Sequence, residues 1–237
     1  MQFQDLIDDP PKVHTTPSGD QYLMSMGPDA LRFIYDNIAA DAKTLETGCG
    51  VSTAVFALKA AEHTCITPAG DEVLNLKSYC RQRNIPLDKV SFQVDGSANA
   101  LVGLDRNHLD LVLIDGCHGF PTVFLDWYYT SARVKVDGIM IIDNTDIWTG
   151  DVLKNVLTGE PEWKLEHWFT AQTAVFRKLR EYDPAKNWVD QPYVVRSSAP
   201  LRRRSRRQWW IQCAKKSAGQ GRPWRLAKDL AHVLLSR

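Results

Sequence analysis

The segment Leu45–Thr53, LETGCGVST, constrains the fold of this chain more than any other feature. A short apolar run ends at Glu46, Gly48 and Gly50 follow, and the next apolar residues have helical spacing. This order predicts a strand, a tight turn and the first turn of a helix. Glycine lets the backbone come close to a ligand, and a helix N-terminus offers unpaired N–H groups. We therefore expect a nucleotide-like ligand outside the carboxyl end of the first strand of an α/β sheet.

The spacing of the glycines narrows the class of ligand. A dinucleotide site needs a third glycine, in the pattern G-x-G-x-x-G, but Thr53 stands at that position. A triphosphate-binding loop needs Gly-Lys-Ser/Thr, which this segment lacks. The remaining pattern, E-x-G-x-G-x-S, resembles motif I of the class I S-adenosylmethionine-dependent methyltransferases. An ordinary strand–helix turn that contains two glycines is the alternative interpretation.

Strands and helices are expected to alternate after this loop. Strands are predicted at 43–47, 63–67, 90–94, 109–115 and 138–143, and helices at 52–61, 71–83, 97–104 and 121–134. This alternation predicts a parallel sheet with helices on both faces. Residues 163–169 and 173–179 have the alternating pattern of a hairpin. The resemblance, which covers 45–179, implies a Rossmann-like, doubly wound, mostly parallel seven-stranded sheet closed by this antiparallel hairpin.

The chain is expected to have three parts. Residues 1–40 are an N-terminal arm and helix that cover the substrate, 41–180 are the methyltransferase domain, and 181–237 are a basic extension. Within these parts, 1–20 is predicted to be a poorly ordered arm and 28–40 a helix. Residues 181–223 resemble a loop, and 224–237 have helical spacing.

From the composition we expect a cytoplasmic protein, with association at a membrane surface left open. Hydrophobic residues make up 44% and charged residues 24% of the 237 residues, as in ordinary globular proteins. The N-terminal stretch lacks the apolar core of a signal peptide, and no apolar run is long enough to cross a bilayer. The five cysteines are widely spaced and form no CxxC pair, which favours reduced thiols over disulfides or zinc.

The resemblance implies a cofactor site for S-adenosylmethionine at the ends of the first three strands. Glu46 would lie near the methionine ammonium, and Asp95 and Ser97 near the adenine. Most family members end the second strand with an acid that binds the ribose hydroxyls, but this chain has Thr67-Pro68 there. Thr67, Asp71 or Glu72 would have to supply that contact. The implied cofactor-binding set is Glu46, Thr47, Gly48, Cys49, Gly50, Thr67, Asp71, Asp95, Gly96, Ser97 and Asp115.

Two acidic strand ends predict where the chemistry takes place. The fourth strand ends at Asp115 and the fifth at Asp143-Asn144, and parallel strands present their carboxyl ends at one edge. Two carboxylates and an amide oxygen are ligands that Mg²⁺ prefers, so Asp115, Asp143 and Asn144 form a candidate metal site. The arrangement looks like that of metal-dependent O-methyltransferases. Turn formation and helix capping are the alternative roles.

His118 is the candidate general base, with Asp115 as a second catalytic residue, because histidine titrates near neutral pH. The acceptor is expected to be a hydroxyl of a small molecule or sugar. It would be covered by 1–40 and 145–160, and Asp146 and Trp148 are candidate lining residues. Asp126 and Trp127 are expected to be packing and surface residues. A relative on the same fold with another activity, such as a hydroxylase or a pseudo-enzyme, is the alternative.

Charge is unevenly distributed along the chain. Residues 1–176 contain 13 Lys and Arg and 24 Asp and Glu, a net −11, whereas 177–237 contain 16 and 4, a net +12. Arginines at 202–207 precede Trp209 and Trp210. Such a segment can bind nucleic acid or an anionic membrane surface, fold back on the acidic body, or mediate homo-oligomer formation. The partner of 202–237 is therefore left open between these alternatives.

Overall fold

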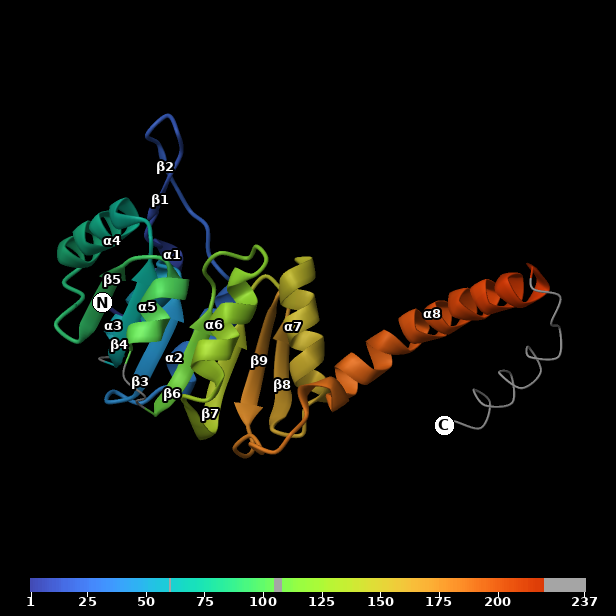
Figure 1. The fold of residues 1–237 in the computed structure, drawn as a ribbon. Coiled ribbons are helices and arrows are strands. Elements are labelled where there is room, and N and C mark those ends of the chain that lie inside the picture. The colour runs from blue at the N-terminus through green and yellow to red at the C-terminus, as the bar shows by residue number, and fades with distance from the viewer. Residues whose placement is uncertain (60, 105–107, 220–237) are drawn as a thin grey trace. The chain divides into compact units, whose positions relative to one another are not determined.

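The computed structural model describes residues 1–59, 61–104 and 108–219, and the chain forms two compact units, Met1–Lys186 and Asn187–Arg237. The first unit contains a seven-stranded sheet of order β5-β4-β3-β6-β7-β9-β8 (Figure 1). The strands are β3 (Lys43–Thr47), β4 (Glu62–Thr67), β5 (Val90–Val94), β6 (Leu109–Ile114), β7 (Val134–Ile142), β8 (Trp163–Phe169) and β9 (Thr173–Lys178).

The directions of the strands confirm the predicted fold class. β3 pairs in parallel with β4 and β6, β4 with β5, and β6 with β7. β9 is antiparallel to both β7 and β8, so the hairpin closes the sheet as expected. Thr47 lies opposite Ile66 of β4 and Ile114 of β6, which brings the glycine turn between the ends of both neighbouring strands.

Helices cover both faces of the sheet (Figure 1). Leu111 and Leu113 of β6 pack into one core with the first four helices, whereas Val112 and Ile114 pack into a second core with the next three. A strand buried on both faces explains why β6 is a continuous apolar run. Among the described residues of the first unit, the helices are α1 (Phe3–Asp8), α2 (Pro28–Asn37), α3 (Val51–Leu58), α4 (Gly70–Gln82), α5 (Ser97–Gly103), α6 (Thr122–Ser131) and α7 (Trp148–Gly159).

The prediction of a poorly ordered arm at 1–20 is wrong. Residues 3–8 form α1, whose Phe3 and Leu6 are buried in the core that contains α3. Two short strands, β1 (His14–Thr15) and β2 (Gln21–Tyr22), pair as an antiparallel hairpin. Two apolar side chains three positions apart are a weak signal in the sequence, but they suffice to fasten one helical turn and a half to a core.

Two helices lie where the sequence predicted none. α7 occupies much of 145–160, and the segment 181–223 contains a 3-10 turn (Trp188–Asp190) and the long helix α8 (Pro192–Gly219). Pro200 lies inside α8, and the Pro, Ser and Arg content of this segment obscured its helical character. The predicted helix at 224–237 lies outside the described residues. None of the helices in the described part of the chain is long and apolar enough to cross a bilayer.

Candidate functional site

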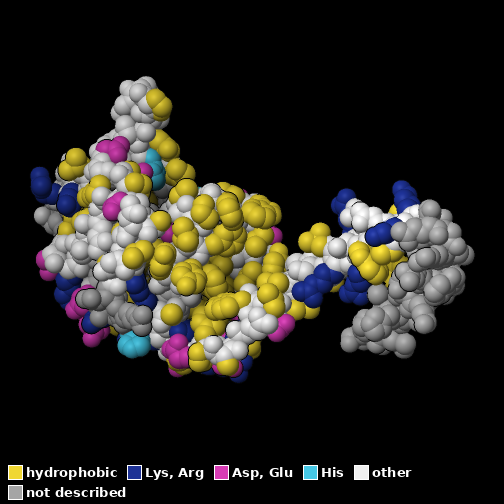
Figure 2. Space-filling model, in the orientation of Figure 1, with side chains coloured by type: hydrophobic (Ala, Val, Ile, Leu, Met, Phe, Trp, Pro, Cys, Tyr) yellow, Lys and Arg dark blue, Asp and Glu magenta, His cyan; other side chains and the backbone are white. Residues whose placement is uncertain are grey.

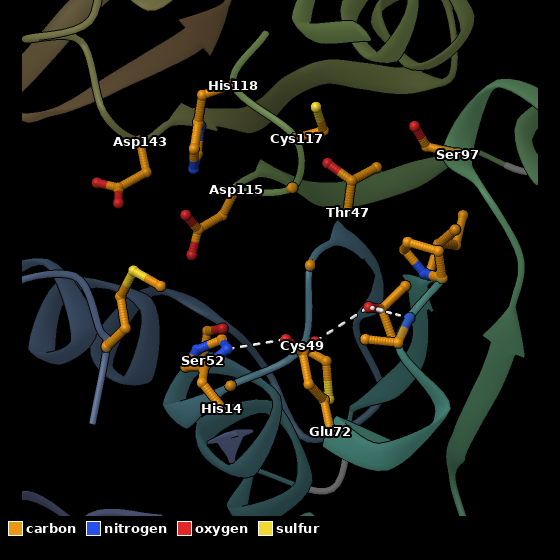
Figure 3. A pocket seen from close by; sticks show the side chains of 18 of the residues that line it. His14, Thr47, Cys49, Ser52, Glu72, Ser97, Asp115, Cys117, His118 and Asp143 are labelled. Atoms are coloured by element: carbon orange, nitrogen blue, oxygen red, sulfur yellow. Dashed lines mark hydrogen bonds and ion pairs between the residues drawn. The ribbon is translucent and has the colours of Figure 1, made fainter. Parts of the chain in front are cut away.

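A cavity of about 590 Å³ opens at the carboxyl edge of the sheet (Figure 3). Its volume falls in the range of small-molecule sites. Of the predicted cofactor set, eight residues line it: Thr47, Gly48, Cys49, Gly50, Thr67, Gly96, Ser97 and Asp115. The predicted catalytic and metal-site residues His118, Asp143 and Asn144 line it as well. Glu46, Asp71 and Asp95 are not among the lining residues.

The glycine loop is fitted tightly against the end of β6. Gly48 has φ +109°, and its N–H donates to the carbonyl of Ile66 at 2.8 Å. A Cβ atom at Gly48 would collide with the backbone carbonyl of Asp115. Only glycine combines this backbone angle with so close an approach. The loop that would hold a cofactor therefore packs directly against the strand end that carries Asp115.

Glu46 lies behind this loop instead of in the cavity. Its side chain is 1% exposed, and it accepts hydrogen bonds from Ser52 at 2.6 Å and from Thr53. His63 Nε2 lies 3.1 Å from the same carboxylate. Ser52 lines the cavity and begins α3, so Glu46 fixes the turn that shapes the cavity wall.

The wall of the cavity where the resemblance implies the cofactor ribose contains an acid, although not at the end of β4. Glu72, in the first turn of α4, lines the cavity and accepts a hydrogen bond from Thr67 at 3.1 Å. His14 Nδ1 lies 2.8 Å from the other oxygen of Glu72 (Figure 3). This carboxylate stands near the position where the family's acid is missing. Of the two acids that were considered, Asp71 and Glu72, it is Glu72 that faces the cavity.

Where the resemblance implies the adenine, Gly96, Ser97 and Ala98 line the cavity, whereas Asp95 is exposed and accepts hydrogen bonds from Gly96 N at 2.6 Å and from the Asn99 amide at 3.2 Å. Asp126 of α6 was expected at the surface or in packing, and the structure buries it completely. Burial raises the pKa of Asp126, while the hydroxyls of Ser97 and Thr47 act in the opposite direction. A buried acid thus stands behind two lining residues.

Two carboxylates face one another at the base of the cavity. Asp115 and Asp143 extend from the ends of β6 and β7 toward a shared space (Figure 3). Asp143 also accepts a hydrogen bond from Thr173 of β9. Burial raises the pKa of Asp115 well above its usual range, and the charges of Asp143 and Glu46 raise it further. Because none of the described residues that line the cavity is Lys or Arg, this acidic pair is an attractive place for a proton or a cation.

His118 lies beside the acidic pair (Figure 3). Its backbone carbonyl accepts a hydrogen bond from Thr149 of α7, which ties the loop after β6 to the first turn of that helix. Burial lowers the pKa of His118, and the charges of Asp143 and Asp146 partly oppose this effect. The imidazole is therefore neutral near pH 7, which is the form that accepts a proton.

The side chains of the predicted metal site can be compared with the ligands that a hard cation prefers. Asp115, Asp143 and Asn144 all line the cavity, and Asn144 has φ +52°, a left-handed conformation that asparagine tolerates. Within the described ranges, no three His, Cys, Asp or Glu side chains form a metal-binding group. The donor set thus consists of two carboxylates and one amide, which fits a hard cation with open positions.

Exposed aromatic residues follow both strand ends that carry the predicted catalytic residues. Phe120, two residues after His118, is 75% exposed, and Trp148, four residues after Asn144, is 66% exposed. Neither they nor Asp146 belongs to the cavity lining. On the face in Figure 2, apolar side chains gather over α6 and α7, the helices that these residues precede or begin. The part of the site next to the predicted base is therefore open and apolar.

The N-terminal arm supplies cavity residues that sequence reasoning assigned only to a general cover. His14, Tyr22, Met24, Ser25 and Met26 line the cavity. The one signal that could have identified them is the placement of a histidine and two methionines in a short polar arm. No spacing rule connects that arm to a strand end 20 or more residues later.

Comparison with known proteins agrees with this geometry. Residues 45–145 match the family model described as a methyltransferase domain. No curated protein matches the chain in sequence.

Among solved structures, cofactor-bound Rv0187 from MTB superposes with a TM-score of 0.57 at 14% identity, over 68% of this chain and 84% of that one. A candidate caffeoyl-CoA O-methyltransferase from Staphylococcus aureus gives 0.56 at 14%, over 66% and 86%. A candidate rRNA methylase from Clostridium thermocellum gives 0.55 at 12%, over 68% and 99%. At these identities the likeness shows the fold, whereas the family model covers the glycine loop and the ends of β6 and β7. Residues 45–145 therefore match a methyltransferase domain, and they lie on the fold of the class I, S-adenosylmethionine-dependent enzymes.

Proposed function

We propose that this methyltransferase transfers its methyl group to a hydroxyl of a small molecule or sugar. The observation that carries the proposal is the packing of Gly48 against the backbone of Asp115, because it joins the cofactor loop to the residues that would handle the acceptor. Asp115, His118 and Asp143 all face the same cavity as the loop (Figure 3). A cofactor on the loop and an acceptor beside His118 would thus share one enclosed space.

The cofactor supplies a methyl group on a sulfonium, which is ready for direct displacement by an acceptor oxygen. The protein then has two tasks, alignment of the acceptor and removal of its proton. In this proposal the hydroxyl proton passes to a ring nitrogen of His118 as the carbon–oxygen bond forms. The negative charges of Asp143 and Asp146, which act on the pKa of His118, stabilise the imidazolium that results.

For the cofactor, we propose that Glu72 takes the ribose hydroxyls in place of the acid that is absent after β4. It is the acid in the cavity nearest that strand end in sequence, and Thr67 and His14 hold its two oxygens. Glu46 acts through the loop as a positioning residue, since its carboxylate is occupied by Ser52, Thr53 and His63.

Mg²⁺ assistance is also proposed. Asp115, Asp143 and Asn144 would hold the ion, which would lower the pKa of the acceptor hydroxyl and fix its oxygen. The support for this proposal is the pair of facing carboxylates without a lysine or arginine in the described lining of the cavity. Calorimetry with MgCl₂ tests it on the protein itself. No heat of binding with the wild type, or the same heat with Asp143→Ala, would remove the metal from the proposal.

The central test has two steps. First, calorimetry with S-adenosylhomocysteine should show binding to the wild type, and its absence would contradict the methyltransferase assignment in favour of a non-methyltransferase relative. Second, radiolabelled S-adenosylmethionine is incubated with a panel of catechols, other phenols and sugars, and with total RNA. His118→Gln should lower kcat by about 10² to 10⁴-fold, the contribution of a general base, while cofactor affinity stays within threefold. Transfer to RNA alone would overturn the small-molecule acceptor.

A further inference from the structure

The N-terminal arm is fastened along α4 by contacts that converge on the proposed ribose ligand. The hydroxyl of Tyr79 donates to the carbonyl of Asp9 at 2.6 Å, and Asp9 also forms an ion pair with Arg83. One turn earlier on α4, the amide of Asn75 donates to the carbonyl of Val13 at 2.9 Å. The next contact along the arm is His14 with Glu72, at 2.8 Å.

Beyond His14 the arm turns over the cavity. His14 pairs with Tyr22 across the β1–β2 hairpin, and their rings lie 5.5 Å apart. Tyr22, Met24 and Met26 then form one wall of the cavity. Next to this wall the arm is held by the carboxylate that faces the cavity and by Asn75, whose amide also donates to the hydroxyl of Thr15 at 3.3 Å.

We propose that the His14–Glu72 pair couples cofactor binding to closure of the arm over the cavity. This inference rests on the proposed cofactor role of Glu72. With one Glu72 oxygen bound to His14 and the other to Thr67, the carboxylate is held in a single orientation before a ribose arrives. An arm that orients Glu72 raises cofactor affinity, and by linkage the bound cofactor must stabilise the closed arm to the same degree.

A double-mutant cycle tests the coupling. Affinity for S-adenosylhomocysteine is measured by calorimetry for the wild type, His14→Ala, Glu72→Gln and the double variant. Each single change should weaken binding about tenfold, and the double variant should be no weaker than Glu72→Gln, because His14 acts only through Glu72. His14→Asn should recover most of the loss, since its amide can donate where Nδ1 does. Additive losses, or no recovery with asparagine, would overturn the proposal.

Limited chymotrypsin digestion provides a second readout that does not require activity. Tyr22, Leu23 and Met24 are 40%, 46% and 57% exposed and offer cleavage sites in the arm. Saturating S-adenosylhomocysteine should slow cleavage severalfold in the wild type and in His14→Asn, but not in His14→Ala. Equal protection of His14→Ala would mean that the ligand covers the arm directly. If the wild type binds no S-adenosylhomocysteine, the proposed function fails instead, so the two failures are distinguishable.

Independently of the cavity, the second unit carries an unusual helix. The 28 residues of α8 include the basic residues Arg196, Arg202, Arg203, Arg204, Arg206, Arg207, Lys215 and Lys216, and no Asp or Glu. The arginines at 202–207 are exposed, and Lys and Arg side chains are visible along the helix in Figure 2. No ion pair involving these basic side chains occurs among the described residues of this unit.

The distribution of charge around α8 indicates the class of partner. Consecutive helical residues point about 100° apart, so Arg202, Arg203 and Arg204 together cover more than half of the circumference. Trp209, Trp210 and Ile211 are also consecutive and spread in the same way. A helix that lies on a membrane needs one continuous apolar face, and α8 has none. A helix that is basic all round fits a ligand with negative charge on several sides.

We infer that α8 binds nucleic acid through its phosphate backbone. Arginines form charge-assisted hydrogen bonds to phosphate, and the indole rings of Trp209 and Trp210, 5.3 Å apart, are available for stacking with bases. Binding of this kind depends on charge and is tolerant of sequence. This surface would bring the enzyme to nucleic acid whether or not nucleic acid is the methyl acceptor.

Fluorescence anisotropy of the full chain with labelled 20-mers tests this surface. We expect micromolar affinity for RNA or DNA near 50 mM KCl and a steep decrease toward 200 mM. Replacing the five arginines at 202–207 by glutamine should weaken binding at least tenfold, whereas replacement by lysine should preserve most of it. Flotation with phosphatidylglycerol vesicles is measured in parallel. Vesicle binding without nucleic-acid binding, or binding to neither, would overturn the inference.

Discussion

The two halves of the cavity are built differently. On the cofactor side, the glycine loop, Glu46 and the arm are buried or hydrogen bonded, and the Glu46 carboxylate alone has three partners. On the acceptor side, the strand ends carry charged groups that face open space, and the first residues beyond them, such as Phe120 and Trp148, are exposed. The difference indicates that the glycine loop and Glu46 are rigid before ligand arrives, while the acceptor half leaves room for the second substrate.

This contrast explains why the ligand of the cofactor half is easier to predict than the ligand of the acceptor half. A rigid loop with a required glycine and a fully buried carboxylate restricts its ligand to few shapes. An open rim with aromatic side chains accepts many flat or apolar groups and specifies none of them. Variants in the cofactor half should therefore change cofactor affinity, whereas variants in the acceptor half should change kcat or the KM for the acceptor.

The largest effect is expected from Asp143→Asn. The change removes a negative charge that faces Asp115 and acts on His118, so kcat should fall by about 10³-fold, comparable to the loss of one electrostatic group from an active site. S-adenosylhomocysteine affinity should stay within threefold, as measured by calorimetry. Asp146→Asn, a change to an exposed acid nearby, is the control and should cost less than tenfold. A large loss of cofactor affinity would show that the two halves are not separate.

Glu46→Gln should produce the next largest effect, in the opposite half. The glutamine amide has one acceptor oxygen, so it cannot accept from both Ser52 and Thr53 and also keep the hydrogen bond with His63. One buried group therefore loses its hydrogen-bond partner, which lowers the free energy of unfolding by about 2 kcal/mol. Affinity for S-adenosylhomocysteine should fall about tenfold or more, with the KM for the acceptor unchanged. Asp95→Asn is the control, since Asp95 is exposed and outside the cavity, and it should leave cofactor affinity unaltered. If Asp95→Asn has the larger effect, the cofactor half is assigned wrongly.

Trp148→Ala tests whether the exposed aromatic residues on the acceptor side bind the acceptor. The indole is 66% exposed, so the truncation costs little stability, but it removes an apolar surface beside the mouth of the cavity. We expect the KM for an aromatic or sugar acceptor to rise about five- to tenfold, equivalent to about 1 kcal/mol, at constant cofactor affinity. Steady-state kinetics at saturating S-adenosylmethionine measures this. An unchanged KM would exclude Trp148 from acceptor binding.

The sheet could be predicted from the sequence because each strand carries its own signal. β3, β5 and β8 have the predicted bounds, because the apolar or alternating pattern that indicates each strand lies within its own residues. The arm, α7 and α8 were missed because their structure depends on contacts elsewhere or is hidden by composition. Phe3 and Leu6 become informative only when α3 is in place, and Pro200 breaks the expected pattern within α8.

The site shows the same division. Asp115, His118, Asp143 and Asn144 could be brought together from the sequence, because the carboxyl ends of parallel strands always meet at one edge. Glu72 remained one of several candidates, since a helix residue reaches a cavity only through a particular rotation of the helix. His14 is 58 residues from Glu72, and no local pattern connects a residue of a polar arm with a carboxylate on α4.

Asp126 offers the smallest but cleanest test, because it lies behind the cofactor half without lining the cavity. Burial raises the pKa of its carboxyl in the folded state, so folding favours the protonated form. The contribution of Asp126 to the free energy of unfolding is full below the pKa of the unfolded state and is lost as the pH rises through the pKa of the folded state. At neutral pH the charged form of this buried carboxyl therefore destabilises the fold. Asp126→Asn should therefore raise the Tm at pH 7.5 by about 2 to 4 °C, equivalent to about 1 kcal/mol, and the gain should shrink toward pH 4.

Thermal melts across this pH range measure the shift in Tm, with the exposed Asp36→Asn as the control. An equal shift at every pH would mean that packing, and not the charge, determines the effect, and a loss of cofactor affinity would place Asp126 within the rigid half after all.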